Sequence, residues 1–404
     1  MTVRGRIRAP EQRSYAIVRT AFVSTYPPRH CGIAAYTHDL ASTTSNREVV
    51  ALHPADLVSA AYPIEVHHRI RKDERADYIR TARALDGCAD IVSIQHEYGI
   101  WGGEDGALVL DFVRALDIPA VATLHTVLQH PTPGQRAVLS DLVALTDATV
   151  VMSRSAATLL SGSYGVDLNR VQVIPHGVPE LPLVEPATAK PALGVDGRLI
   201  VLSFGLLGPG KGYELAIAAL PEVVKAHPSV LYVVVGATHP DLLRTEGEAY
   251  RRSLVEAVAA LGLTDHVRFV DRYVGRVELT QWLEAADVFV TPYPNLDQIV
   301  SGTLSYAMGA GRAIVSTPYA YAAELLADGR GMLVTPGSPT ALGSVVNEVL
   351  GDDDLRLALG ARAYAYSRRM VWSAVGADYR DLMARIATPA PTPARPIVLA
   401  SASA

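Results

Sequence analysis

The chain has 404 residues, of which 49% are hydrophobic and 19% are charged. This composition is typical of a globular protein with two or three domains, and it excludes an intrinsically disordered chain. The formal net charge of −5 argues against a nucleic-acid-binding protein, which would normally carry a basic domain.

Two cysteines, Cys31 and Cys88, lack the spacing of a metal site or a redox motif, which fits a reducing compartment. No stretch approaches the ~20 apolar residues that cross a bilayer, and no secretion signal is recognised. We therefore expect a cytoplasmic protein. The basic N-terminus, with arginines at positions 4, 6, 8 and 13, could make weak contact with an anionic membrane, although a frayed tail is the simpler expectation.

Short runs rich in Val and Ile alternate with helical patterns along most of the chain, as expected for parallel sheets covered on both faces. In the first half the predicted strands are 15–23, 48–52, 90–95, 119–124, 148–152 and 171–174. The predicted helices between them include 33–41, 72–85 and 105–116. After a proline-rich linker at 179–191, the predicted strands are 199–204, 229–235, 267–270, 288–291, 313–316 and 332–335, and the predicted helices are 213–226, 248–261 and 277–286.

This repeated alternation predicts an α/β fold with two doubly wound, Rossmann-like domains that face each other across a deep cleft. We predict the first domain at 1–182 and the second at 195–370. A last helix at 371–387 carries Trp372, Val375, Tyr379 and Leu382 at helical spacing and should pack back on the first domain. Residues 388–404 are rich in Pro, Ala and Ser and are predicted to be disordered.

Two loops of the first domain carry polar residues directly after predicted strands. The segment 24–33 joins a strand to a helix, so free amide groups there can bind hydroxyls or phosphate. The segment 95–105 combines polar, aromatic and glycine residues, the usual means of gripping a sugar. The predicted sugar and acceptor contacts are Arg29, His30, Gly32, His96, Glu97, Tyr98 and Trp101, with His125 after the next strand.

Two loops of the second domain indicate phosphate binding. The loop 205–212 nearly matches a P-loop, but Gly212 occupies the position of the hydroxyl residue that binds magnesium. This substitution argues against an ATPase function. Gly208, Gly210 and Lys211 remain as phosphate contacts, with Lys211 as the point charge. Ser301, Gly302 and Thr303 are predicted to begin a helix and to offer amide groups and hydroxyls to the same anion.

The acidic triplet 352–354 resembles a metal site but lies between two late helices, where a helix cap is the better interpretation. No other metal-ligand constellation and no local nucleophile motif are found. We therefore predict no metal and no other cofactor.

In order and spacing, these loops resemble glycosyltransferase family 4 over about residues 15–385. Tyr26-Pro27-Pro28 with Cys31-Gly32-Ile33 is similar to the family's acceptor loop, and residues 174–178 to the segment that closes its first domain. Residues 205–212 are similar to its G-R-L-x-x-x-K-G loop, and 298–311 to its E-x7-E segment. The resemblance implies the GT-B fold, retaining transfer of a hexosyl group from a nucleotide sugar to a carbohydrate acceptor, and a contact of His125 with the donor sugar.

Three positions depart from the family pattern. Leu206 replaces a phosphate-binding arginine, Gln298 replaces the glutamate that faces the donor sugar, and Tyr306 replaces the one that holds the ribose. A phenol cannot accept from both ribose hydroxyls as a carboxylate does, and Asp297, one residue out of register, could compensate in part. Two alternatives therefore stay open: a phosphorylase that uses phosphate or a sugar 1-phosphate, and a non-catalytic sugar- or nucleotide-binding regulator.

Our main hypothesis assigns catalysis to positioning and charge stabilisation, not to a covalent nucleophile. His125, Lys211 and Gln298 are the predicted catalytic residues, and Tyr306 and Asp297 the predicted nucleotide contacts. The particular sugar, the acceptor and the oligomeric state do not follow from the sequence.

Overall fold

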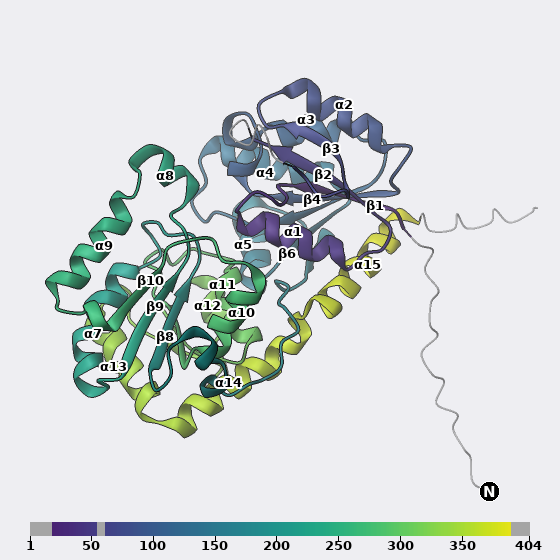
Figure 1. Cartoon of the computed structure of the whole chain (residues 1–404). Coiled ribbons are helices and arrows are strands. Elements are labelled where there is room, and N and C mark those ends of the chain that lie inside the picture. Colours follow the sequence, from purple (N-terminus) through teal and green to yellow (C-terminus); the bar gives the residue numbers. More distant parts are fainter. Residues whose placement is uncertain (1–17, 55–60, 389–404) are drawn as a thin grey trace, which may run out of the picture.

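The computed structural model describes residues 18–54 and 61–388, which form two lobes, each built on a parallel sheet (Figure 1). The first sheet has seven strands in the order β3-β2-β1-β4-β5-β6-β7, and the second has six in the order β10-β9-β8-β11-β12-β13. This confirms the predicted α/β architecture. The predicted disordered tail and the N-terminal arginines lie outside the described residues.

The strands of the first sheet are β1 (Thr20–Ser24), β2 (Arg47–His53), β3 (Val66–Arg71), β4 (Ile91–His96), β5 (Ala120–Leu124), β6 (Ala148–Val151) and β7 (Val171–Val173). Those of the second are β8 (Leu199–Phe204), β9 (Val230–Val235), β10 (Val267–Val270), β11 (Val288–Thr291), β12 (Ala313–Ser316) and β13 (Met332–Leu333). Central strands such as β9 are buried at every residue, because helices cover both faces of the sheet.

The helices before the second sheet are α1 (Gly32–Ser42), α2 (Arg75–Leu85), α3 (Leu108–Arg114), α4 (Pro133–Leu145), α5 (Arg154–Tyr164) and α6 (Pro186–Ala189). Those that follow are α7 (Tyr213–Ala226), α8 (Pro240–Glu246), α9 (Ala249–Ala260), α10 (Arg276–Ala285), α11 (Gly302–Gly309), α12 (Ala320–Leu325), α13 (Pro339–Gly351), α14 (Asp353–Ser367) and α15 (Trp372–Ala387). None of the described helices is long and apolar enough to cross a membrane.

Several elements differ from the sequence-based prediction. Strand β3 was missed because it is an edge strand whose residues are mostly half-buried or exposed, so its sequence VHHRIR lacks an apolar run. Helices α4 and α5 lie between strands of the first sheet, where the alternating pattern predicts helices. The helix predicted at 105–116 is shorter, because Asp105 has φ of 52° and a single 3-10 turn precedes α3.

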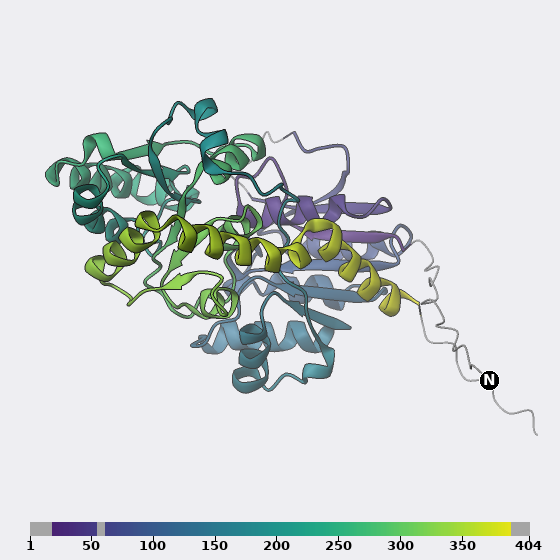
Figure 2. The same cartoon turned by 90° about the horizontal axis from the view of Figure 1, so that it is seen from below.

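Helix α15 extends from the second lobe to the first along one side of the molecule (Figure 2). Its predicted apolar stripe is buried in one cluster with Phe22 and Tyr36 of the first lobe, which confirms that the stripe serves packing. The hydroxyl of Tyr379 lies 3.1 Å from that of Tyr36 and 3.0 Å from that of Thr123. Asp352 caps α14 by accepting from the amide of Leu355, as predicted for the acidic triplet.

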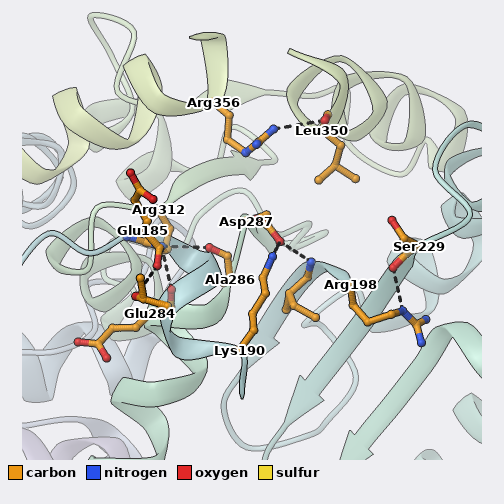
Figure 3. A network of polar contacts seen from close by, with 12 residues as sticks. Glu185, Lys190, Arg198, Ser229, Glu284, Ala286, Asp287, Arg312, Leu350 and Arg356 are labelled. Carbon is orange, nitrogen blue, oxygen red and sulfur yellow. Dashed lines mark hydrogen bonds and ion pairs between the residues drawn. The ribbon is translucent and has the colours of Figure 1, made fainter. Parts of the chain in front are cut away.

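The proline-rich linker is attached to the second lobe by buried charged groups (Figure 3). Lys190 donates to Asp287 at 2.7 Å, and the same carboxylate accepts from the amide of Ile200. Arg312 donates to the carbonyl of Val184 in the linker. These bonds fix the chain between β7 and β8; the exact domain limits at 182 and 195 stay a prediction.

Candidate active site between the two sheets

The four predicted binding loops all leave the sheets at the points where strand order reverses. In the first sheet this point lies between β1 and β4, and in the second between β8 and β11. Ligands of doubly wound folds bind outside the carboxyl ends of strands at such points. The loops at 25–31, 97–103, 205–212 and 292–301 are the ones that follow these strands.

Contacts between the lobes show that these edges face each other. The rings of His30 and Tyr273 stack with centroids 4.2 Å apart, and the hydroxyl of Ser153 donates to the carbonyl of Ile299 at 3.1 Å. The residues around this interface therefore form one candidate site made by both lobes.

His125 follows β5 and is bonded to Gln95 of β4, whose Oε1 lies 2.9 Å from Nε2 of the imidazole. Burial, together with the nearby His176 and His96, lowers the pKa of His125 to about 3. The imidazole is therefore neutral near pH 7, and it can orient a hydroxyl but does not supply a positive charge.

His96 ends β4 and is fully buried, and neither of its ring nitrogens has a hydrogen-bond partner in the described structure. Burial lowers its pKa to about 3. Buried polar atoms are normally satisfied. The two free nitrogens therefore make His96 a candidate for contact with a bound hydroxyl compound or water.

His176 was not predicted as a site residue, although its segment was matched to the family. Its Nδ1 lies 2.7 Å from the carbonyl oxygen of Gly177, so Nδ1 carries the proton and Nε2 is the acceptor. A side-chain carbon placed on Gly302 would lie 3.0 Å from this Nε2. His176 therefore sits against the start of α11, the predicted anion site. Burial lowers its pKa to about 4.

The loop after β1 carries Arg29 and His30, and the ring of His30 reaches the interface by stacking on Tyr273. Arg29 is half-buried, and its Nη1 is buried without a partner in the described structure. Gly32, the first residue of α1, is exposed, and a side-chain carbon there would meet nothing within 4 Å. The start of α1 is therefore open on this side, as an anion or hydroxyl site at a helix N-terminus requires.

The loop after β4 corrects part of the prediction. Trp101 is 1% exposed and belongs to the core of the first lobe, where its Nε1 donates to the carbonyl of Gln95. Tyr98 is 9% exposed, and its hydroxyl donates to the carbonyl of Gln135. Neither ring is free to stack on a sugar, because both rings are buried against other side chains of the first lobe. Glu97 remains half-buried near the site, and burial raises its pKa while Lys72 and Arg29 oppose that rise.

The loop after β8 places Lys211 against Tyr293, which follows β11. Its Nζ lies 4.4 Å from the centroid of the Tyr293 ring, a cation–π contact that leaves the ammonium half-buried. Gly212 has φ of 71°, and a side-chain carbon there would lie 2.1 Å from the carbonyl oxygen of Pro292. Gly208 is buried and Gly210 is exposed, with φ of 89°.

The start of α11 lies beside Lys211 through a short chain of hydroxyl groups. The hydroxyl of Tyr293, whose ring carries the ammonium, lies 3.0 Å from that of Thr303, which is 3.1 Å from that of Ser301. Ser301 caps the helix by accepting from the amide of Leu304. Lys211 and the first amides of α11 thus concentrate positive potential in one place.

The structure separates the three residues of the altered E-x7-E segment. Gln298 is half-buried and donates to the carbonyl of Val300, whereas Asp297 is exposed. The hydroxyl of Tyr306 donates to Asp39 of α1 at 3.2 Å. Asp39 also pairs with Arg276 of α10. The sequence analysis did not identify Asp39 or Arg276, because neither residue belongs to a recognisable motif.

Within the described residues, no group of three or more metal-binding side chains is found. Charge stabilisation at this site can come from the ammonium of Lys211 and the start of α11.

Comparison with known proteins agrees with this geometry. Residues 30–180 match the profile described as Glycosyltransferase Family 4, and residues 187–366 match Glycosyl transferases group 1. A D-inositol 3-phosphate glycosyltransferase of Xylanimonas cellulosilytica is 30% identical over 330 residues, which cover 75% of this chain and 74% of that protein. A GDP-mannose-dependent monoacylated α-(1-6)-phosphatidylinositol monomannoside mannosyltransferase of Corynebacterium glutamicum is 22% identical over 377 residues. The matched region covers 89% of this chain and 95% of that protein.

Among solved structures, Anabaena HepE in complex with UDP superposes with a TM-score of 0.74 at 18% identity, covering 91% of this chain and all of that one. WaaG, a glycosyltransferase involved in lipopolysaccharide biosynthesis, superposes with a TM-score of 0.65 at 18% identity. The match covers 90% of this chain and 99% of that one. The two facing parallel sheets thus define a GT-B glycosyltransferase fold.

The chain belongs to glycosyltransferase family 4. It is a hexosyltransferase that moves a hexosyl group from a nucleotide sugar to a sugar or other small-molecule acceptor.

Proposed function

We propose that the chain is a retaining, metal-independent hexosyltransferase whose reaction takes place between the carboxyl edges of its two sheets. The observation that carries the proposal is the pairing of two chemistries across the interface. The second lobe presents Lys211 and the start of α11, while the first presents the uncharged imidazoles of His96 and His125. A donor with an anionic leaving group and a neutral sugar matches both sides.

In this proposal, Lys211 and the amides of residues 302 and 303 stabilise the departing nucleoside diphosphate as the bond between the anomeric carbon and the phosphate oxygen breaks. The acceptor oxygen bonds to the anomeric carbon on the same face of the sugar, and its proton passes to a phosphate oxygen. Because His96 and His125 are neutral, they orient sugar hydroxyls by hydrogen bonds. Gln298 binds the transferred sugar, and Arg29, His30 and Glu97 contact the acceptor.

The nucleotide side is the part that the altered residues change most. We propose that Gly208 and Gly210 contact the diphosphate and that Asp297 and Tyr306 contact the ribose. We propose a cytoplasmic location, supported by the two free cysteines, Cys31 and Cys88.

The test is transfer from a panel of UDP-, GDP- and ADP-sugars to sugars and polyols, with D-inositol 3-phosphate in the acceptor panel because a relative acts on it. NMR of the product should show the donor's anomeric configuration. An inverted product would refute the retaining mechanism. Turnover that requires inorganic phosphate or a sugar 1-phosphate would favour a phosphorylase, and binding without turnover a regulator.

A further inference from the structure

One buried carboxylate of the first lobe is bound entirely by the second. Asp39 lies in α1 and is 4% exposed. Its Oδ2 accepts from the hydroxyl of Tyr306 in α11 at 3.2 Å, and its Oδ1 pairs with a guanidinium nitrogen of Arg276 at the start of α10. Among the described residues, these are the hydrogen-bond partners of its carboxylate. Both belong to the second lobe.

The protonation of this cluster is fixed by its surroundings. Burial, and then the charge of Asp39, raise the pKa of Tyr306, so its hydroxyl keeps its proton and donates. Arg276 is always protonated. Its side chain is 55% exposed, against 2% for that of Asp39, so the ion pair runs from the rim of the interface into its interior. The inner bond to Tyr306 is sheltered from salt, while the outer bond is partly screened.

A second contact joins the second lobe to the start of α1. Tyr273, three residues before Arg276, stacks on His30, which lies just before α1. Figure 1 shows α1 on the side of the first lobe that faces α10 and α11. A separate contact lies at α5, where Glu324 of the second lobe accepts from the amides of Arg154 and Ser155. The Asp39 cluster therefore fixes one side of the interface and the α5 contact another.

We propose that Asp39 is a positioning residue that holds the two lobes in the arrangement needed for transfer, through its paired bonds to Tyr306 and Arg276. The inference rests on the proposed function at this interface. Any separation of the lobes at α1 breaks both bonds together and exposes the carboxylate to water. Donor and acceptor groups come from different lobes, and a misplacement of about 1 Å can reduce turnover by about 100-fold. Asp39 thus acts on the reaction without touching the substrates.

The experiment uses the full chain with Asp39→Asn and Arg276→Met, and with Arg276→Lys as the conservative variant. Asp141→Asn is the matched control, because it removes a carboxylate from a surface ion pair with Arg114 in which both side chains are half exposed. Small-angle scattering without substrate reports the arrangement of the lobes. Steady-state kinetics separates kcat from the KM for donor.

We expect Asp39→Asn and Arg276→Met to enlarge the radius of gyration and to lower kcat by about tenfold or more, with the donor KM changed less than about threefold. Arg276→Lys should recover most of the lost turnover, and Asp141→Asn should match the wild type. If Asp39→Asn does not fold, Arg276→Met carries the same expectation.

Unchanged scattering and unchanged kcat in these variants would overturn the proposal. So would a rise in donor KM as large as the loss of kcat, because that pattern belongs to a residue that touches the donor. An enzyme without transferase activity would instead contradict the proposed function, and the scattering comparison would still decide the role of Asp39.

Discussion

Gln95 and His125 form a hydrogen bond that decides which nitrogen of the imidazole carries the proton. The amide Oε1 of Gln95 can only accept, so the Nε2 of His125, 2.9 Å away, must carry the proton. The Nδ1 of the neutral ring is then the acceptor. A residue in β4 therefore sets the hydrogen-bonding role of a residue that follows β5.

Replacing Gln95 with leucine should reduce turnover. Gln95→Leu removes the acceptor and leaves both ring nitrogens free to exchange the proton, so we expect kcat/KM to fall by about tenfold, the scale of one hydrogen bond. Gln95→Glu keeps an acceptor at the same place and should retain more activity. Equal kcat/KM in Gln95→Leu and the wild type would show that the tautomer of His125 does not matter.

Lys211→Met should lower kcat by about 100-fold or more, since it removes the one side-chain cation that we place at the leaving phosphate. The melting temperature should hardly change, because the ammonium is half-buried and contacts Tyr293 through a single cation–π interaction. Lys225→Met, on the exposed end of α7, is the matched control. Turnover near that of the wild type would remove Lys211 from the mechanism.

The stability of the protein should fall in mild acid. The buried His96 has its pKa lowered from 6.5 to about 3, so between these values the unfolded chain binds a proton that the folded chain does not. The stabilisation is complete above pH 6.5 and is lost as the pH falls below it. His176, with its pKa lowered to about 4, acts in the same direction.

His96→Phe should weaken this dependence by about 1.4 kcal/mol per pH unit well below pH 6.5, the contribution of one proton. Urea unfolding at pH 7, 6 and 5 measures it, with His130→Phe at an exposed position as the control. If the free energy of unfolding of His96→Phe declines with acidity as steeply as that of the wild type, His96 takes up its proton in the folded protein.

Activity should persist in excess chelator. In the proposed mechanism the leaving group is stabilised by Lys211 and by the amides at the start of α11, so no divalent cation takes part. Initial rates after dialysis against EDTA, with and without added Mg²⁺ or Mn²⁺, should agree within error. Complete loss of the activity and its return with either ion would contradict metal independence.

The buried pair of Lys190 and Asp287 should be needed for stability. Their side chains are 9% and 6% exposed and 2.7 Å apart (Figure 3). Asp287→Ala leaves a buried ammonium without its partner, which should lower the free energy of unfolding by about 3–5 kcal/mol. The double variant Lys190→Met with Asp287→Leu should recover much of this loss. A loss below about 1 kcal/mol in Asp287→Ala would mean that Lys190 reaches water easily.

The sequence by itself determined the strands and the loops that follow them. An apolar run such as 230–235 records burial on both faces of a sheet, and a glycine such as Gly212 records a backbone conformation that other residues avoid. These are local properties, so they survive in a linear pattern. The edge strand β3 was not predicted, because it has a neighbouring strand on one side only. Its polar residues therefore obscure the pattern of apolar residues that marks a strand.

Only the tertiary structure decided which of the polar and aromatic residues face the site. Trp101 matches a sugar-stacking pattern in the sequence, yet packing places it in the core. Tyr306 and Asp39 are 267 residues apart, and neither segment of the sequence predicts a contact with the other. A hydrogen bond between distant residues depends on how two lobes meet, and local periodicity carries no information about that contact.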